Sequence, residues 1–161
     1  MNRETTCAGP GSRAALVRDA TAALEGMAEA LSRELDRHAQ AFGLSDAKLE
    51  LLEVLGCCRG DRTCLFDLGD RLGVTRPNVT KLVDGLERNG FVERMPHPSD
   101  RRMVQAHLTG AGHEVAGQAL PGRTERMLTA WDRLSDEELV DLVRLLKRAL
   151  ALEPVSTGQP A

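Results

Sequence analysis

The chain has 161 residues, of which 42% are hydrophobic and 28% are charged, and it carries a formal net charge of −3. This length and composition fit one globular domain, or two lobes that share a core. No segment approaches the length of a membrane span, and residues 1–13 lack the apolar stretch of a signal peptide. We therefore expect a cytoplasmic protein with no membrane partner, whose four cysteines are reduced thiols.

The N-terminal part of the chain is expected to form two helices after a disordered tail at residues 1–12. Between Leu16 and Phe42 apolar side chains recur every three or four residues, with His38 at one of these positions. This spacing predicts one long amphipathic helix that ends at Gly43. A second helix is expected to begin at Ser45-Asp46. Its predicted inward side chains are Leu49, Leu52, Val54 and Leu55.

A helix-turn-helix is predicted next. Its first helix covers Asp67–Leu72 and ends at Gly73. Its second helix has Thr75 as the predicted N-cap and stops at Asn89-Gly90. Leu82, Val83 and Leu86 are expected to pack inward, with Gly85 allowing close packing, which leaves a polar side. The side chains predicted to face DNA are Thr75, Arg76, Pro77, Asn78, Thr80 and Lys81.

These residue types suit DNA. Asparagine can bond adenine through two hydrogen bonds, arginine or lysine can bond guanine, and threonine can touch a thymine methyl or a phosphate. Two short strands, Phe91–Met95 and Met103–Leu108, are expected to follow, the second alternating Val104, Ala106 and Leu108 with polar residues. A helix-turn-helix followed by a basic hairpin is the layout of a winged helix-turn-helix, whose second helix enters the major groove.

The charge distribution supports this interpretation. Between Arg71 and Arg102 there are seven basic and four acidic residues, which gives that segment +3 and leaves −6 for the rest of a chain whose net charge is −3. A basic surface on an acidic body is what contact with phosphate requires.

Two further helices are predicted towards the C-terminus. Thr109 is expected to cap a helix from Ala111 to Trp131, interrupted at Pro121-Gly122, and the sequence from Ser135 to Glu138 is a capping box for the last helix. The first and last helices carry more apolar surface than a monomer needs. A two-fold dimer would bury that surface and place two recognition helices one DNA turn apart on a palindromic operator. Residues 153–161 are expected to be disordered.

Three stretches, LVDGLERNGFVER, SDRRMVQAHLTGAG and LSDEELVDLVRLL, together resemble the MarR family of bacterial regulators. The resemblance covers Leu16 to Leu152 and rests on the motifs LE-x-x-G-x-V-x-R, D-x-R and L-T-x-x-G. It implies a mainly α fold with a small β-hairpin wing. The resemblance further implies a homodimeric transcription factor, with a winged helix-turn-helix at 46–110 and a helical dimerisation domain at 13–45 and 111–152.

The resemblance also implies roles for individual residues. The arginine of D-x-R is Arg102, which in the family enters the minor groove, and Asp100 would orient it by a charge-assisted bond. His97 and Arg101 lie beside it at the tip. Small ligands of the family lodge near the end of the first helix. His38 and Phe42 are thus candidate pocket residues for an aromatic or phenolic effector, although His38 could instead be a hydrogen-bonded core residue.

A thiol switch is the alternative signal input. Cys64 is expected at a helix N-terminus, where the helix dipole lowers a thiol pKa, and Cys57 and Cys58 are within loop reach for a disulfide. Alternatively, Cys57 and Cys58 are small buried hydrophobes and Cys64 is a substitute cap. No recognised catalytic, phosphate-binding or metal-binding motif is present. We therefore expect that the protein is not an enzyme and has no cofactor and no bound metal. With the resemblance, we expect a repressor that a small ligand releases.

Overall fold

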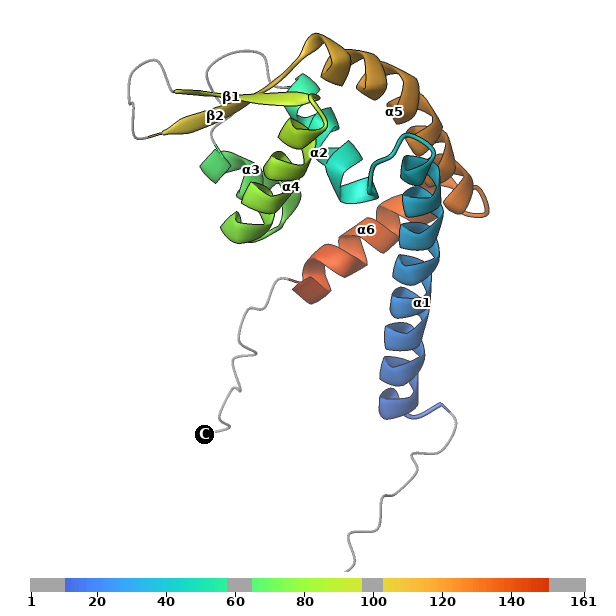
Figure 1. Ribbon diagram of the computed structural model, residues 1–161. Coiled ribbons are helices and arrows are strands. Elements are labelled where there is room, and N and C mark those ends of the chain that lie inside the picture. The colour runs from blue at the N-terminus through green and yellow to red at the C-terminus, as the bar shows by residue number, and fades with distance from the viewer. Residues whose placement is uncertain (1–10, 58–64, 97–102, 151–161) are drawn as a thin grey trace, which may run out of the picture. The chain divides into compact units, whose positions relative to one another are not determined.

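The computed structural model describes residues 11–57, 65–96 and 103–150. Six helices and one two-stranded antiparallel sheet confirm, within these residues, the expected mainly α fold with a hairpin (Figure 1). No helix of the described residues is long and apolar enough to cross a membrane. The elements are α1 (Arg13–Gln40), α2 (Asp46–Cys57), α3 (Leu65–Leu72), α4 (Arg76–Arg88), β1 (Val92–Pro96), β2 (Val104–Leu108), α5 (Gly110–Ala130) and α6 (Asp136–Leu150).

The chain divides into two compact units, residues 1–127 and 128–161. The second unit contains α6. The predicted capping box is confirmed there: the Ser135 N–H donates to Glu138 Oε2 at 2.9 Å, and the Glu138 N–H donates to Ser135 Oγ at 3.3 Å. Along α6, Leu139, Leu142 and Leu146 are half-buried, and four further apolar side chains are exposed. These four are Val140, Val143, Leu145 and Leu150.

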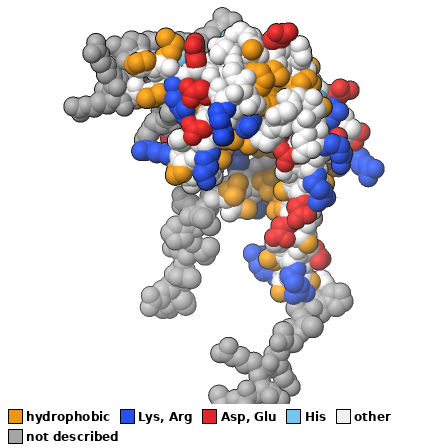
Figure 2. Space-filling model, viewed as in Figure 1, with side chains coloured by type: hydrophobic (Ala, Val, Ile, Leu, Met, Phe, Trp, Pro, Cys, Tyr) orange, Lys and Arg blue, Asp and Glu red, His pale blue; other side chains and the backbone are white. Residues whose placement is uncertain are grey.

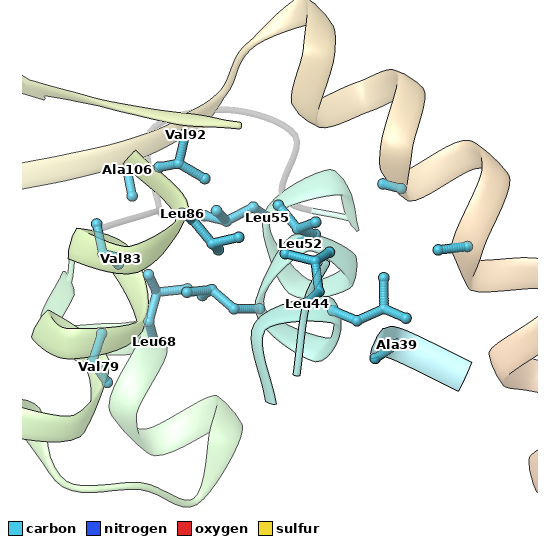
Figure 3. Packing of buried hydrophobic residues seen from close by; sticks show 14 residues of the cluster. Ala39, Leu44, Leu52, Leu55, Leu68, Val79, Val83, Leu86, Val92 and Ala106 are labelled. Atoms are coloured by element: carbon cyan, nitrogen blue, oxygen red, sulfur yellow. The ribbon is translucent and has the colours of Figure 1, made fainter. Parts of the chain in front are cut away.

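The core of the first unit lies between α2, α3, α4 and the hairpin. Figure 3 shows Val92 and Ala106 of the hairpin directed at Val83 and Leu86 of α4. Gly85 of α4 faces Lys48 of α2, and an added Cβ would lie 2.8 Å from Lys48 Cε, which confirms the close packing expected at this glycine. The largest fully buried side chains are Leu49, Leu51, Leu52, Leu68, Leu86, Val79, Val83 and Val92.

Val54 of α2 packs against the core as expected, although it is only partly buried. Leu51 is fully buried as well and was not predicted. On β2 the expected alternation was wrong, since Val104 is exposed and the neighbouring Gln105 is only 3% exposed. Val104 lies at the far end of the hairpin opposite Pro96, beyond the helices that cover the rest of the strand.

The hairpin is joined to α4 and α5 by a tight backbone junction. Gly90 follows α4 with a φ of +73°, a conformation that favours glycine. The Thr109 hydroxyl donates to the Gly90 carbonyl at 2.7 Å and accepts from the Gly112 N–H at 3.0 Å, which confirms Thr109 as the cap of α5. The backbone at Gly112 passes so close to the backbone of Phe91 that an added Cβ would lie 2.0 Å from the Phe91 carbonyl oxygen.

Helix α5 runs without interruption through Pro121, so the predicted break at Pro121-Gly122 was wrong. Proline removes the hydrogen bond to the carbonyl of Gly117, four residues earlier. Both residues are exposed, so water can satisfy that carbonyl. The helix is also tied to α2 just beyond the proline, through Arg123.

Arg123 is a buried arginine that connects α5 to α2. Its Nε donates to Asp46 Oδ1 at 2.7 Å, and its Nη1 donates to Glu53 Oε2 at 3.0 Å. Burial alone would lower the pKa of Arg123, but the hydrogen bond and charge of Asp46 and the charge of Glu53 raise it above its ordinary value. The Asp46 N–H in turn donates to Asp36 Oδ1 of α1 at 2.8 Å, so one polar network joins α1, α2 and α5.

Replacing Gly112 with alanine should destabilise the protein by roughly 3 kcal/mol, the upper end for overpacking, because the new Cβ would meet the backbone of Phe91. Gly117 lies in the same helix with nothing within 4 Å of an added Cβ. Gly117→Ala should therefore stabilise the protein by up to about 1 kcal/mol. Urea-unfolding midpoints measure both effects, and a Gly112→Ala protein as stable as the wild type would contradict the close approach.

Candidate nucleic-acid interface

The turn between α3 and α4 is short and held by the backbone. Helix α3 ends at Leu72 and Gly73 follows with a φ of +63°, as the sequence predicts. The Val74 N–H then donates to the Gly69 carbonyl at 3.0 Å. An added Cβ at Gly69 would lie 3.1 Å from the Val74 carbonyl oxygen, so a larger residue would require this turn to shift slightly. The turn thereby sets the angle at which α4 leaves α3.

Helix α4 has a buried side and a polar side. Val79, Val83 and Leu86 are buried in the core. All six side chains predicted to face DNA are exposed, and Thr80 Oγ1 donates to the Arg76 carbonyl at 3.1 Å. Pro77 lies in the first turn, as expected. The exposed residues are Thr75, Arg76, Pro77, Asn78, Thr80 and Lys81.

Thr75 is the N-cap of α4, but its side chain makes no capping hydrogen bond. Instead its carbonyl accepts from the N–H groups of Asn78 at 2.9 Å and Val79 at 3.1 Å. An exposed helix N-terminus with an uncommitted threonine hydroxyl is suited to a phosphate oxygen.

Arg94 of β1 is ion-paired with α4, although sequence reasoning counted it only as a basic residue of the segment between Arg71 and Arg102. Its Nη2 donates to Asp84 Oδ1 of α4 at 2.5 Å, and its Nη1 pairs with Glu87 Oε2. Burial alone would lower the pKa of Arg94, but hydrogen bonds and charges from Asp84 and Glu87 raise it above its ordinary value. Arginine and carboxylate side chains accordingly lie intermixed around the hairpin and α4 on the face shown in Figure 2.

The predicted wing tip, with His97, Asp100, Arg101 and Arg102, lies outside the described residues. The strands that lead to it are described up to Pro96 and from Met103, and their last pair is Pro96 with Val104. At this end of the hairpin Met95, Met103 and Val104 are exposed. The roles assigned to the tip residues therefore stay predictions.

His38 has a partner within the protein. Its Nε2 lies 2.8 Å from the Ala119 carbonyl oxygen of α5, and its ring meets Phe42 edge-on with centroids 5.3 Å apart. An added Cβ at Gly122 would lie 2.7 Å from His38 Cε1, so the ring fills the space over that glycine. This arrangement favours the hydrogen-bonded alternative for His38, while its role in a ligand pocket stays a prediction.

Among the candidate redox cysteines, only Cys57 belongs to the described residues. It ends α2 and is exposed, so the alternative in which Cys57 is a small buried hydrophobe was wrong. Cys58 and Cys64 lie outside the described residues. No group of His, Cys, Asp and Glu in the described part of the chain could hold a metal ion.

Comparisons with known proteins point in one direction. The sequence model of the MarR family matches residues 48–104. The chain is 36% identical to the HTH-type transcriptional regulator YkoM of Bacillus subtilis, over 75% of this chain and 77% of YkoM. It is 32% identical to the HTH-type transcriptional repressor YetL of the same species, over 72% of this chain and 70% of YetL.

Solved structures agree with the sequence relatives. The fold is similar to Sco3205, a MarR family transcriptional regulator from Streptomyces coelicolor whose crystal structure is a complex with DNA. The TM-score is 0.77 and the identity 29%, covering 89% of this chain and 92% of that chain. AbsC, another MarR family regulator from the same species, gives a TM-score of 0.77 at 26% identity, covering 83% of this chain and 90% of that chain.

Two threonine caps offer a matched test of the interface. Thr75→Ala should change the free energy of unfolding by less than about 0.5 kcal/mol, because no capping bond is lost, whereas Thr109→Ala should cost about 1–2 kcal/mol. Thr75→Ala should nevertheless weaken binding to DNA, because it removes a hydroxyl that we expect to bond a phosphate oxygen. Urea unfolding and fluorescence anisotropy on duplex DNA measure the two effects. If Thr75→Ala lost much stability and kept its DNA affinity, Thr75 would have only a structural role as a helix cap, contrary to this prediction.

Proposed function

Because the chain belongs to the MarR family of transcriptional regulators, we propose that it is a homodimeric, sequence-specific DNA-binding protein that represses transcription. Its partners are double-stranded palindromic operator DNA in the cytoplasm, a second copy of the chain, and a small effector molecule. Family members are regulators and not enzymes, and the proposed activity needs no cofactor.

The observation that carries this proposal is the two-sided packing of α4. The helix buries Val79 and Val83 and leaves Arg76, Asn78 and Lys81 exposed along its N-terminal half. These are side chains that read base edges or bind phosphates. The hairpin beside α4 leads to the segment with Arg102, which we assign to the minor groove. Sco3205, a similar protein whose crystal structure is a complex with DNA, supports DNA binding by this fold.

A second copy of the chain explains the apolar surface of the terminal helices. On α1, Leu16 is 61% exposed and Leu24 is 48% exposed, and on α6, Leu150 is 77% exposed. Burying one such side chain contributes about 1.5–3 kcal/mol. We propose that residues 13–45 and 111–152 form the dimerisation domain and that residues 46–110 form the DNA-binding domain. A two-fold axis would then place two α4 helices on successive major grooves.

We place the signal input near the end of α1. His38 and Phe42 lie together there, next to α5, and His38 bonds a carbonyl that a ligand could compete for. An aromatic or phenolic effector would stack on Phe42 and pair with the imidazole. The alternative is a thiol switch of Cys64 with Cys57 or Cys58. The exposure of Cys57 is the observation that keeps this alternative open.

The proposed function is tested by fluorescence anisotropy on palindromic fragments from upstream of the protein's own gene. The wild type should bind with an affinity that falls steeply with salt. Arg102→Ala should weaken binding roughly 5- to 100-fold, the range for a lost base contact, while Arg133→Ala, an exposed arginine between α5 and α6, should not. Binding that is absent, or indifferent to salt, would reject the proposal.

The signal is tested on the same fragment with peroxide. If a ligand releases the protein, peroxide-treated and reduced protein should bind DNA within about twofold of each other, inside the error of a typical Kd. Oxidative release that is lost in Cys64→Ser or Cys57→Ser, but retained in Cys7→Ser, would replace the ligand by the thiol switch.

A further inference from the structure

The geometry points to Arg94 as a positioning residue that holds the wing at a fixed angle to the recognition helix through Asp84 and Glu87. We call these three residues the wing clamp. The inference rests on the proposed function, since it assigns a role in DNA binding to residues that need not touch DNA. It concerns the part of the hairpin nearest α4, all of which belongs to one compact unit.

The clamp is a two-pronged contact. Asp84 and Glu87 are three residues apart and therefore share a flank of α4. The Arg94 guanidinium reaches both carboxylates, with Nη2 2.5 Å from Asp84 Oδ1 and Nη1 paired with Glu87. The Arg94 side chain is 24% exposed, against 48% for Asp84 and 40% for Glu87. A planar guanidinium bonded to two carboxylates is fixed in direction as well as position.

Arg94 also occupies the point where the hairpin leaves the body of the protein. On the same face of β1, Val92 is buried on one side of Arg94, and Pro96 is exposed on the other. Its cross-strand partner, Ala106, is fully buried, whereas Val104, opposite Pro96, is exposed. Arg94 therefore lies where β1 passes from buried to exposed residues, and at this point the strand is tied to α4.

The charges of the clamp argue against a direct role in binding phosphate. Its two carboxylates outnumber its one guanidinium, and both stand on the helix that we assign to DNA. Acidic groups on such a surface repel phosphate and lower affinity. The guanidinium is meanwhile engaged by the carboxylates. Partly exposed ion pairs of this kind contribute little to global stability, so fixing the angle between α4 and the wing is the role that remains for the clamp.

Binding depends on that angle because α4 and the wing tip are assigned to different grooves of one duplex. A wing that turns freely about the buried end of the hairpin would lose entropy when both elements bind. A clamped wing is already ordered. Loss of the clamp should therefore weaken DNA binding through the wing and leave contacts of α4 intact.

The decisive variant is Asp84→Asn with Glu87→Gln, which removes two negative charges and the clamp but keeps side-chain size. Simple electrostatics predicts stronger DNA binding by this double variant. The wing clamp predicts binding weaker by roughly fivefold or more, within the range for coupled residues. The matched control is Glu93→Gln, which removes an exposed acid from the strand residue next to Arg94 and should leave binding unchanged or slightly stronger. All are measured by anisotropy on the fragment that binds wild type.

A double-mutant cycle separates positioning from direct contact. Arg94→Gln should weaken DNA binding in the wild-type background but have little further effect in Arg102→Ala, because both changes act through the wing. Unfolding midpoints of all variants should lie close to the wild type. Tighter binding by Asp84→Asn with Glu87→Gln, or additive losses in the cycle, would overturn the clamp while leaving the proposed function standing. A wild type that binds no DNA would overturn both.

Discussion

The packing of α4 is the constraint on which the rest of the DNA-binding lobe depends. Val79, Val83 and Leu86 all lie on one side of this helix and are fully buried. Turning the helix to hide its polar side would expose them, at about 1.5–3 kcal/mol for each side chain. The rotation of α4 about its axis is thus set by its apolar residues, and Asn78 and Lys81 face outward as a consequence. The interface therefore follows from how the core packs.

The hairpin is fixed to the same helix by backbone geometry and by charge. Gly90 turns the chain after α4, Thr109 bonds back to it, and Gly112 lets α5 pass against Phe91. This junction explains why the residues of two family motifs, LE-x-x-G-x-V-x-R and L-T-x-x-G, occur at these spacings. The glutamate and arginine of the first motif pair with each other across the junction, as Glu87 and Arg94. Its glycine makes the turn and its valine is buried.

Local signals in the sequence predicted most of the elements. Amphipathic spacing and capping residues located the helices to within a few residues, and the glycines at 73 and 90 marked the helix ends correctly. The six candidate side chains at the start of α4 are exposed as expected, although their contacts with DNA stay predictions. These features depend on neighbours within four residues along the chain, which is why a single sequence reveals them.

Features that depend on distant partners were missed. Arg94 looked like a basic residue of the DNA-binding face, and only the fold brings it to Asp84. Arg123 is buried because Asp46, 77 positions earlier, lies beside it. The unbroken helix at Pro121 and the buried Gln105 likewise depend on which surfaces are covered. The sequence did contain one indication of the clamp, because Glu87 and Arg94 belong to the same family motif. The motif alone, however, does not indicate that the two side chains form an ion pair.

We propose that two copies of α4 and its wing bind one operator together, and hydroxyl-radical footprinting of the protein on its operator tests this. Two equivalent protected regions related by two-fold symmetry are expected, with centres about 10 base pairs, or one helical turn, apart, and with added protection in the flanking minor grooves. A single unsymmetrical footprint, or protection confined to the major groove, would contradict binding by two copies.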